Sequence, residues 1–164
     1  MPMPEISLPS TAGEIVNLGL ISSPWLILFC YPRTGRPDQD PPGGLSNWNA
    51  IPGARGCTPQ ACGYRDAHAA FRALGATVYG LSTQETEYQR EAVERLHLPY
   101  ALLSDAGLAL VRALRLPTFD VQGQSLVKRL TLAISAGRVR QVWYPVMPPD
   151  ADAASVLTWL QARH

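Results

Sequence analysis

One run of residues organises this chain: Gly56-Cys57-Thr58-Pro59-Gln60-Ala61-Cys62-Gly63-Tyr64-Arg65-Asp66. It places two cysteines five positions apart, at the point where a loop gives way to a helix. Apolar residues recur downstream at three- and four-residue spacing as far as Leu74, the pattern of a helix packed on a core. The unpaired N–H groups and aligned peptide dipoles at a helix start stabilise a thiolate, the reactive form of cysteine. We therefore interpret the run as a redox site, with Cys57 at the helix start.

The spacing of Cys57 and Cys62 limits how the two could form a disulfide. Five positions along an ideal helix give Cα atoms about 8.7 Å apart. Bridged cysteines normally have Cα atoms less than about 7 Å apart. The two thiols can therefore join only if the first helical turn unwinds, and we expect a catalytic disulfide that is coupled to local unfolding.

Strand and helix patterns alternate along the rest of the chain, which indicates an α/β fold. Ile6–Leu8 and Glu14–Leu18 predict an N-terminal β-hairpin, and Trp25–Tyr31 predicts a buried central strand. The further expected elements are a strand at Ala76–Ser82, a helix at Glu85–Leu96, a strand at Tyr100–Leu103, a helix at Gly107–Leu114, strands at Leu130–Ser135 and Arg138–Tyr144, and a helix at Asp150–Arg163. Alternation implies parallel crossovers, and the last two strands imply an antiparallel hairpin. We therefore expect a central mixed β-sheet flanked by helices.

The run around the two cysteines resembles the peroxiredoxin family, and within it the group of bacterioferritin comigratory protein and peroxiredoxin Q. Members of that group share the pattern Gly-Cys-Thr-x-x-Ala-Cys-x-(Phe/Tyr)-Arg-Asp. Further matches extend almost end to end; they are Leu28-Phe29-Cys30-Tyr31-Pro32, Val78-Tyr79-Gly80-Leu81-Ser82, Leu102-Leu103-Ser104-Asp105 and Arg129-Leu130-Thr131-Leu132-Ala133-Ile134. The resemblance implies a thioredoxin-like fold. It also implies that Cys57 is the peroxidatic cysteine, Cys62 the resolving cysteine and Arg129 the arginine of the site.

The same resemblance implies a thiol-dependent peroxidase acting on hydrogen peroxide and organic hydroperoxides. Cys57 would become a sulfenic acid, and Cys62 would condense with it to give an intramolecular disulfide. A thioredoxin-like or glutaredoxin-like dithiol would then reduce that disulfide. Arg129 would stabilise the Cys57 thiolate and hold the peroxide with fixed N–H donors. The chemistry needs no metal, flavin or nucleotide cofactor, and we expect a monomer.

The chain departs from the family pattern just before the first cysteine. The family usually has a threonine three residues before the peroxidatic cysteine, with its hydroxyl touching both the thiolate and the peroxide. This chain has Ala54 there. Thr34, Arg55 and Thr58 are candidates to supply the missing hydroxyl or donor, and the sequence does not choose among them.

An insertion from about residue 33 to residue 55, rich in proline and glycine, precedes the redox run. Such a composition predicts little regular structure. One interpretation is a tolerated surface excursion, because loops carry most of the length variation that proteins permit. In another, Trp48 and Ile51 roof the Cys57 pocket and favour organic hydroperoxides, or pack beneath the loop and hold it down.

The composition predicts a single domain over residues 1–164, because a chain of this length with 46% hydrophobic residues can bury a substantial core. A net charge of +1, with basic and acidic residues interspersed, argues against nucleic-acid or anionic-membrane partners. The first residues lack the features of a secretory signal, so we expect a cytoplasmic protein. Three cysteines are too few for a disulfide framework. Cys30 lies within the expected central strand and is interpreted as a buried structural residue.

Two cysteines in one segment are compatible with three other kinds of function, of which the sequence disfavours two. A metal site is disfavoured, because His68, His97 and His164 show no paired ligand spacing with the two cysteines. A dithiol oxidoreductase acting on protein disulfides is disfavoured by the four residues that separate Cys57 from Cys62, since such enzymes use a Cys-x-x-Cys pair. A peroxide-responsive redox switch or binding module without efficient turnover remains the non-enzymatic alternative, and Ala54 keeps it open.

Overall fold

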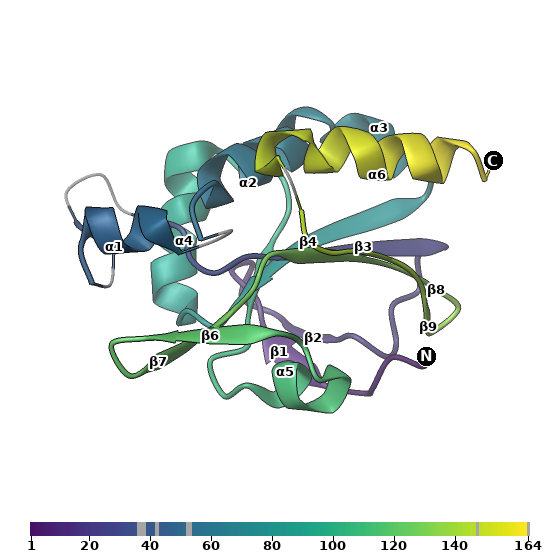
Figure 1. The fold of residues 1–164 in the computed structure, drawn as a ribbon. Coiled ribbons are helices and arrows are strands. Elements are labelled where there is room, and N and C mark those ends of the chain that lie inside the picture. Colours follow the sequence, from purple (N-terminus) through teal and green to yellow (C-terminus); the bar gives the residue numbers. More distant parts are fainter. Residues whose placement is uncertain (36–38, 42, 52–53, 147, 164) are drawn as a thin grey trace.

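The computed structural model describes residues 1–35, 39–41, 43–51, 54–146 and 148–163. A five-stranded mixed sheet forms its centre (Figure 1). The strands, in spatial order, are β5 (Leu102–Ser104), β4 (Ala76–Ser82), β3 (Trp25–Cys30), β8 (Leu130–Ser135) and β9 (Arg138–Trp143). Strands β3, β4 and β5 are parallel, whereas β8 is antiparallel to both β3 and β9. The predicted central mixed sheet is confirmed. Among the described residues, no helix has the length and apolar character to cross a membrane.

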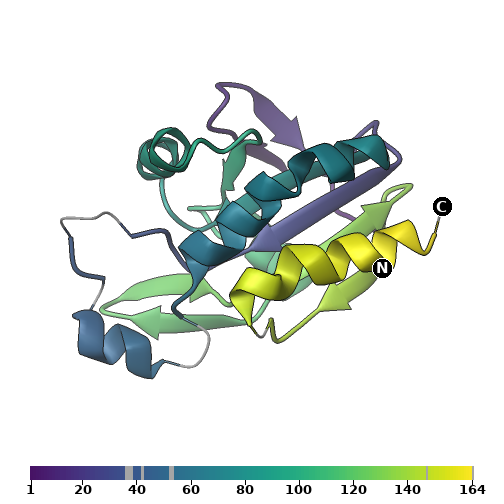
Figure 2. The same ribbon diagram turned by 90° about the horizontal axis from the view of Figure 1, so that it is seen from above.

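Helices cover both faces of this sheet. On one face lie α2 (Cys57–Asp66), α3 (His68–Ala73) and α6 (Asp152–Gln161), and on the other lies α5 (Ala109–Leu114), with the N-terminal hairpin beside it (Figure 1). Seen from above, α2 and α6 run side by side across the sheet (Figure 2). The helix α4 (Thr86–Leu96) packs against β5. This arrangement places the start of α2 next to the start of α6.

The central strand β3 divides the interior into two cores. Ile27, Phe29 and Tyr31 belong to the core beneath α2 and α6, whereas Leu26, Leu28 and Cys30 belong to the core on the α5 side. Successive side chains of a strand point to opposite faces, so a run that is apolar throughout serves both cores. Cys30 is fully buried, as predicted. Burial, together with the charge of Asp105, raises the pKa of its thiol far above the ordinary value.

Two small hairpins accompany the sheet. The predicted N-terminal hairpin is confirmed as β1 (Ser7–Pro9) paired with β2 (Ile15–Asn17). A second hairpin, β6 (Thr118–Val121) with β7 (Gln124–Val127), was not predicted. The sequence carried a signal for it, namely Gln122-Gly123 after a segment that alternates polar and apolar residues. In the structure both residues of this turn have positive φ.

Two expectations differ from the structure in detail. The helix expected from Cys57 to Leu74 is interrupted at Ala67, whose φ of −95° and ψ of 3° leave the helical region, so two helices form. The insertion, expected to have little regular structure, contains the short helix α1 (Leu45–Ala50). Residues 36–38, 42 and 52–53 of the insertion lie outside the described residues. The last helix is preceded by one turn of 3₁₀ helix, η1 (Pro149–Ala151).

We predict that Gly80→Ala destabilises this sheet. A Cβ atom at Gly80 would lie 2.6 Å from Leu102 Cδ2 and 2.7 Å from Phe29 Cζ, and both side chains are fully buried. Overpacking a closed core typically costs about 1–3 kcal/mol of the free energy of unfolding. Urea denaturation measures this loss. The control is Gly107→Ala, where a Cβ atom meets nothing within 4 Å; equal stability of the two variants would contradict the prediction.

Candidate active site

Cys57 is the first residue of α2. Gly56, immediately before it, adopts φ 105°, and a Cβ atom there would lie 2.6 Å from Pro149 Cγ. Glycine is therefore required at this position for both conformation and space. The tight entry buries Cys57, which is 5% exposed, at the end of α2 where N–H groups lack helical partners. The expected helix-start position of Cys57 is confirmed.

Arg129 lies against the sulfur of Cys57. Its Nη2 is 3.2 Å from Cys57 Sγ, and the same nitrogen donates to the carbonyl oxygens of Ala54 at 3.1 Å and Arg55 at 2.9 Å. The Arg129 side chain is 3% exposed, so its orientation is fixed by these contacts. The structure thus brings together two of the three residues that the sequence singled out. A buried guanidinium at this distance stabilises a thiolate.

Position 54, where the family has a threonine, offers Cys57 a backbone carbonyl oxygen and no side-chain hydroxyl. Ala54 is fully buried, and its carbonyl oxygen lies 3.7 Å from Cys57 Sγ. The Thr34 hydroxyl instead lies 3.4 Å from Gln84 Oε1, to which it donates. Arg55 and Thr58 both line the cavity beside Cys57. Of the three candidate replacements, these two lie at the site.

Cys62 lies five residues further along the same helix and is half-buried. Both thiols are free in this structure. Because the helix is continuous from Cys57 to Asp66, the geometric argument made from the sequence applies here, and a disulfide requires that the first turn unwinds. Arg65, in the same motif, pairs with Asp66 and donates to the carbonyl oxygen of Leu96, so it braces the helix surface.

A buried network behind Arg129 was not predicted. Arg129 Nη1 donates to Gln60 Oε1 at 2.7 Å, and Gln60 Nε2 donates to Asp152 Oδ2 at 3.0 Å. The hydroxyls of Tyr64 and Thr131 donate to the same carboxylate oxygen. Burial, together with the charge of Asp152, raises the pKa of Tyr64, so it remains a donor. The sequence carried one hint, since Gln60 follows Cys57 by one helical turn; it carried none for Asp152.

A cavity of about 280 Å³ opens beside Cys57 and is partly walled by the insertion. Leu45 and Trp48 of α1 supply apolar wall, and Arg33 and Arg55 supply positive charge. Trp48 also packs in a small third core with Ala54 and Leu126, with Ile51 and Phe119 against its edge. In both views α1 lies at the same end of the molecule as the tip of the β6–β7 hairpin (Figures 1 and 2). Trp48 therefore both lines the cavity and holds the insertion down.

The described residues contain no group of three or more His, Cys, Asp or Glu side chains placed to hold a metal ion. The polar groups that face Cys57 are instead an arginine, backbone carbonyls and the helix N-terminus. The guanidinium and the helix N-terminus stabilise negative charge, and the carbonyl oxygens hold the guanidinium in place. The arrangement suits a thiolate nucleophile and an oxygen leaving group.

Comparison with known proteins gives consistent matches. A family model described as Redoxin matches residues 1–157. Peroxiredoxin Bcp of Bacillus subtilis is 26% identical over 94% of this chain and 90% of its own length. Chloroplastic peroxiredoxin Q of Gentiana triflora is also 26% identical, over 97% of this chain, which spans only 64% of that relative. The crystal structure of peroxidoxin BcpB from Mycobacterium tuberculosis is 28% identical, with a TM-score of 0.79 over 100% of this chain and 96% of that one.

Proposed function

The chain belongs to the redoxin family, and from this premise we propose that it is a thiol-dependent peroxidase that reduces hydrogen peroxide and organic hydroperoxides. The observation that carries the proposal is the 3.2 Å contact between Arg129 Nη2 and Cys57 Sγ at the start of α2. A guanidinium, a helix N-terminus and a thiol in one buried corner are the components that nucleophilic attack on a peroxide needs. The relatives named peroxiredoxin support the same conclusion.

In the first step the Cys57 thiolate attacks the terminal oxygen of the hydroperoxide. An S–O bond forms while the O–O bond breaks, and the leaving oxygen takes a proton to become water or an alcohol. Cys57 is left as a sulfenic acid. Arg129 stabilises the negative charge that moves from sulfur to the leaving oxygen, because its N–H donors are held by Gln60 and by the carbonyl groups of Ala54 and Arg55.

In the second step the Cys62 thiolate attacks the sulfur of the sulfenic acid. The Cys57–Cys62 bond forms and hydroxide leaves, to be protonated to water. This step requires the first turn of α2 to unwind. A thioredoxin-like or glutaredoxin-like dithiol then attacks the disulfide, becomes oxidised itself and restores both thiols.

The proposal includes the setting of the enzyme. Residues 1–164 work as one domain, with residues 33–55 inserted before the site. The small number of cysteines supports a reducing compartment such as the cytoplasm, and we propose that the protein is a monomer there. Neither a metal nor an organic cofactor takes part in the steps above.

The test is turnover of hydrogen peroxide by the reduced protein with thioredoxin, thioredoxin reductase and NADPH. Sustained NADPH oxidation that depends on peroxide and on Cys57 is the expected result. A single stoichiometric oxidation without turnover would favour the redox switch. Reduction of insulin disulfides at a rate that exceeds peroxide turnover would favour the dithiol oxidoreductase.

We predict that Leu45→Ser narrows the range of peroxides used. Leu45 is 59% exposed and lines the cavity beside Cys57, so it can contact the apolar part of an organic hydroperoxide. Partial loss of that contact corresponds to about 1 kcal/mol, or roughly a fivefold fall in kcat/KM for cumene hydroperoxide. Hydrogen peroxide has no apolar part, so its kcat/KM should not change.

The matched control is Leu20→Ser, because Leu20 is 67% exposed and is absent from the cavity wall. It should leave kcat/KM for both peroxides unchanged. Equal losses for both peroxides in Leu45→Ser would show that α1 acts on the site as a whole and not on the organic substrate.

A further inference from the structure

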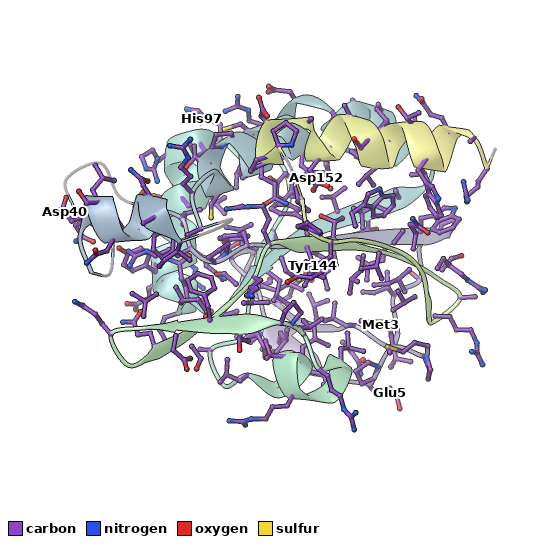
Figure 3. The ribbon with its side chains drawn as sticks, viewed as in Figure 1. Met3, Glu5, Asp40, His97, Tyr144 and Asp152 are labelled. Atoms are coloured by element: carbon purple, nitrogen blue, oxygen red, sulfur yellow. The ribbon has the colours of Figure 1, made fainter. Side chains whose placement is uncertain are left out.

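Asp152 is a buried carboxylate that receives three hydrogen bonds on one oxygen. It is 4% exposed and is the first residue of α6. Its Oδ2 accepts from Gln60 Nε2 at 3.0 Å, from the Tyr64 hydroxyl at 2.7 Å and from the Thr131 hydroxyl at 2.7 Å. Figure 3 shows Asp152 between α6 and the central sheet. One side chain therefore joins the start of α6 to α2 and to β8.

The carboxylate also determines which end of the Gln60 amide faces Arg129. A carboxylate can only accept hydrogen bonds and a guanidinium can only donate them. Gln60 is fully buried between the two, so its NH₂ group must face Asp152 and its oxygen must face Arg129. With the amide in this orientation, Arg129 keeps the position from which Nη2 reaches Cys57 Sγ. Asp152 thus acts on the reacting sulfur through two intermediate side chains.

Two of the three donors to Asp152 lie on α2, at different places along the helix. Gln60 lies in the first turn, which must unwind before Cys57 can reach Cys62. Tyr64 lies beyond Cys62, in the part of the helix that can stay folded. The Gln60 contacts with Asp152 and Arg129 are therefore lost when the first turn unwinds, whereas the Tyr64 contact can be kept.

We infer that Asp152 is a positioning residue that favours the fully helical form of α2, and so assists the peroxide step while it opposes the disulfide step. The inference rests on the proposed function. The Asp152 carboxylate should therefore raise the rate of the peroxide step and lower the rate of the disulfide step. A longer-lived sulfenic acid is the consequence, and a second peroxide can oxidise that sulfenic acid to sulfinic acid.

Stopped-flow tryptophan fluorescence separates the two steps, because Trp48 lines the cavity beside Cys57. The first phase should depend on peroxide concentration and report sulfenic acid formation. The second should be independent of it and report disulfide formation. In Asp152→Asn the carboxylate charge is lost and the Gln60 amide can turn. We expect the first phase to slow about fivefold to tenfold and the second to accelerate by a similar factor.

Gln60→Met provides a second test that leaves Asp152 in place. It removes the two hydrogen bonds that the Gln60 side chain makes with Asp152 and Arg129, and it keeps the side-chain volume similar. The first phase should again slow and the second should accelerate. If Asp152→Asn does not fold, the Gln60→Met variant alone tests the inference. At excess peroxide, mass spectrometry should show at least threefold less sulfinic acid at Cys57 in both variants than in the wild type.

A merely structural role is distinguished by Tyr64→Phe. It removes an equally buried hydrogen bond to the same oxygen, but on the part of α2 that stays folded. It should accelerate the second phase much less than Gln60→Met does, even where thermal unfolding shows equal loss of stability. Asp150→Asn is the control, because Asp150 is exposed two positions before Asp152 and should leave both phases unchanged.

The outcomes separate the inference from the proposed function. Two phases in the wild type with unchanged rates in Asp152→Asn and Gln60→Met would overturn the inference alone. Acceleration of the second phase in Tyr64→Phe equal to that in Gln60→Met would also overturn it, in favour of general loosening. A wild type without any peroxide-dependent phase would overturn both.

Discussion

Cys57→Ser is expected to abolish reaction with peroxide, because a serine hydroxyl has no accessible anionic form to replace the thiolate. After one equivalent of hydrogen peroxide, the intact mass of the wild type should fall by two hydrogens, as a disulfide forms. Cys62→Ser should gain one oxygen, because its sulfenic acid has no partner. Cys57→Ser should keep its mass.

The control for this series is Cys30→Ala. Cys30 is fully buried on the opposite side of β3 from the core that contains Cys57, so its removal should leave the two-hydrogen loss intact. Oxidation of Cys57→Ser at the wild-type rate would place the reactive thiol elsewhere. A slow reaction in the wild type, no faster than that of a free thiol, would instead mean that Ala54 has cost the site its peroxidase activity.

Arg129→Lys is expected to give the second largest effect. Lysine keeps the positive charge but replaces the planar fork by a single ammonium group, which cannot reach Cys57, Gln60 and the two loop carbonyls together. Loss of one fixed donor to a developing oxyanion typically costs about 10²- to 10³-fold in rate. We expect a loss of this size in the second-order rate constant of the first fluorescence phase.

Arg112→Lys is the matched control, because Arg112 is exposed on α5, across the sheet from the site. It should react at the wild-type rate. A rate within twofold of wild type in Arg129→Lys would show that charge alone suffices, and that the fixed N–H directions contribute little. Thermal unfolding of both variants checks that a slow rate does not come from a damaged fold.

The sequence predicted the helices and strands of this fold correctly where the local pattern of apolar residues was strong. Trp25–Cys30 is apolar throughout because both of its faces are buried, and the segments after it alternate as a parallel sheet requires. The β6–β7 hairpin was missed although its Gln122-Gly123 turn was visible. The helix α1 was missed because six residues in a proline- and glycine-rich segment give too short a pattern, and it is Trp48 packing against Phe119 and Leu126 that holds it.

The sequence by itself determined the two thiols, their spacing and the helix start, because these are properties of a single local segment. It also pointed to Arg129, but only through resemblance to a family, since nothing local shows that residue 129 meets residue 57. Only the tertiary structure decided that Arg129, Gln60 and Asp152 form one chain of hydrogen bonds behind the sulfur. Arg129 directly precedes β8, Gln60 lies in α2 and Asp152 begins α6, so the three residues are far apart in the sequence. They meet because both helices pack on the same face of the sheet, where their polar groups form hydrogen bonds with one another away from water.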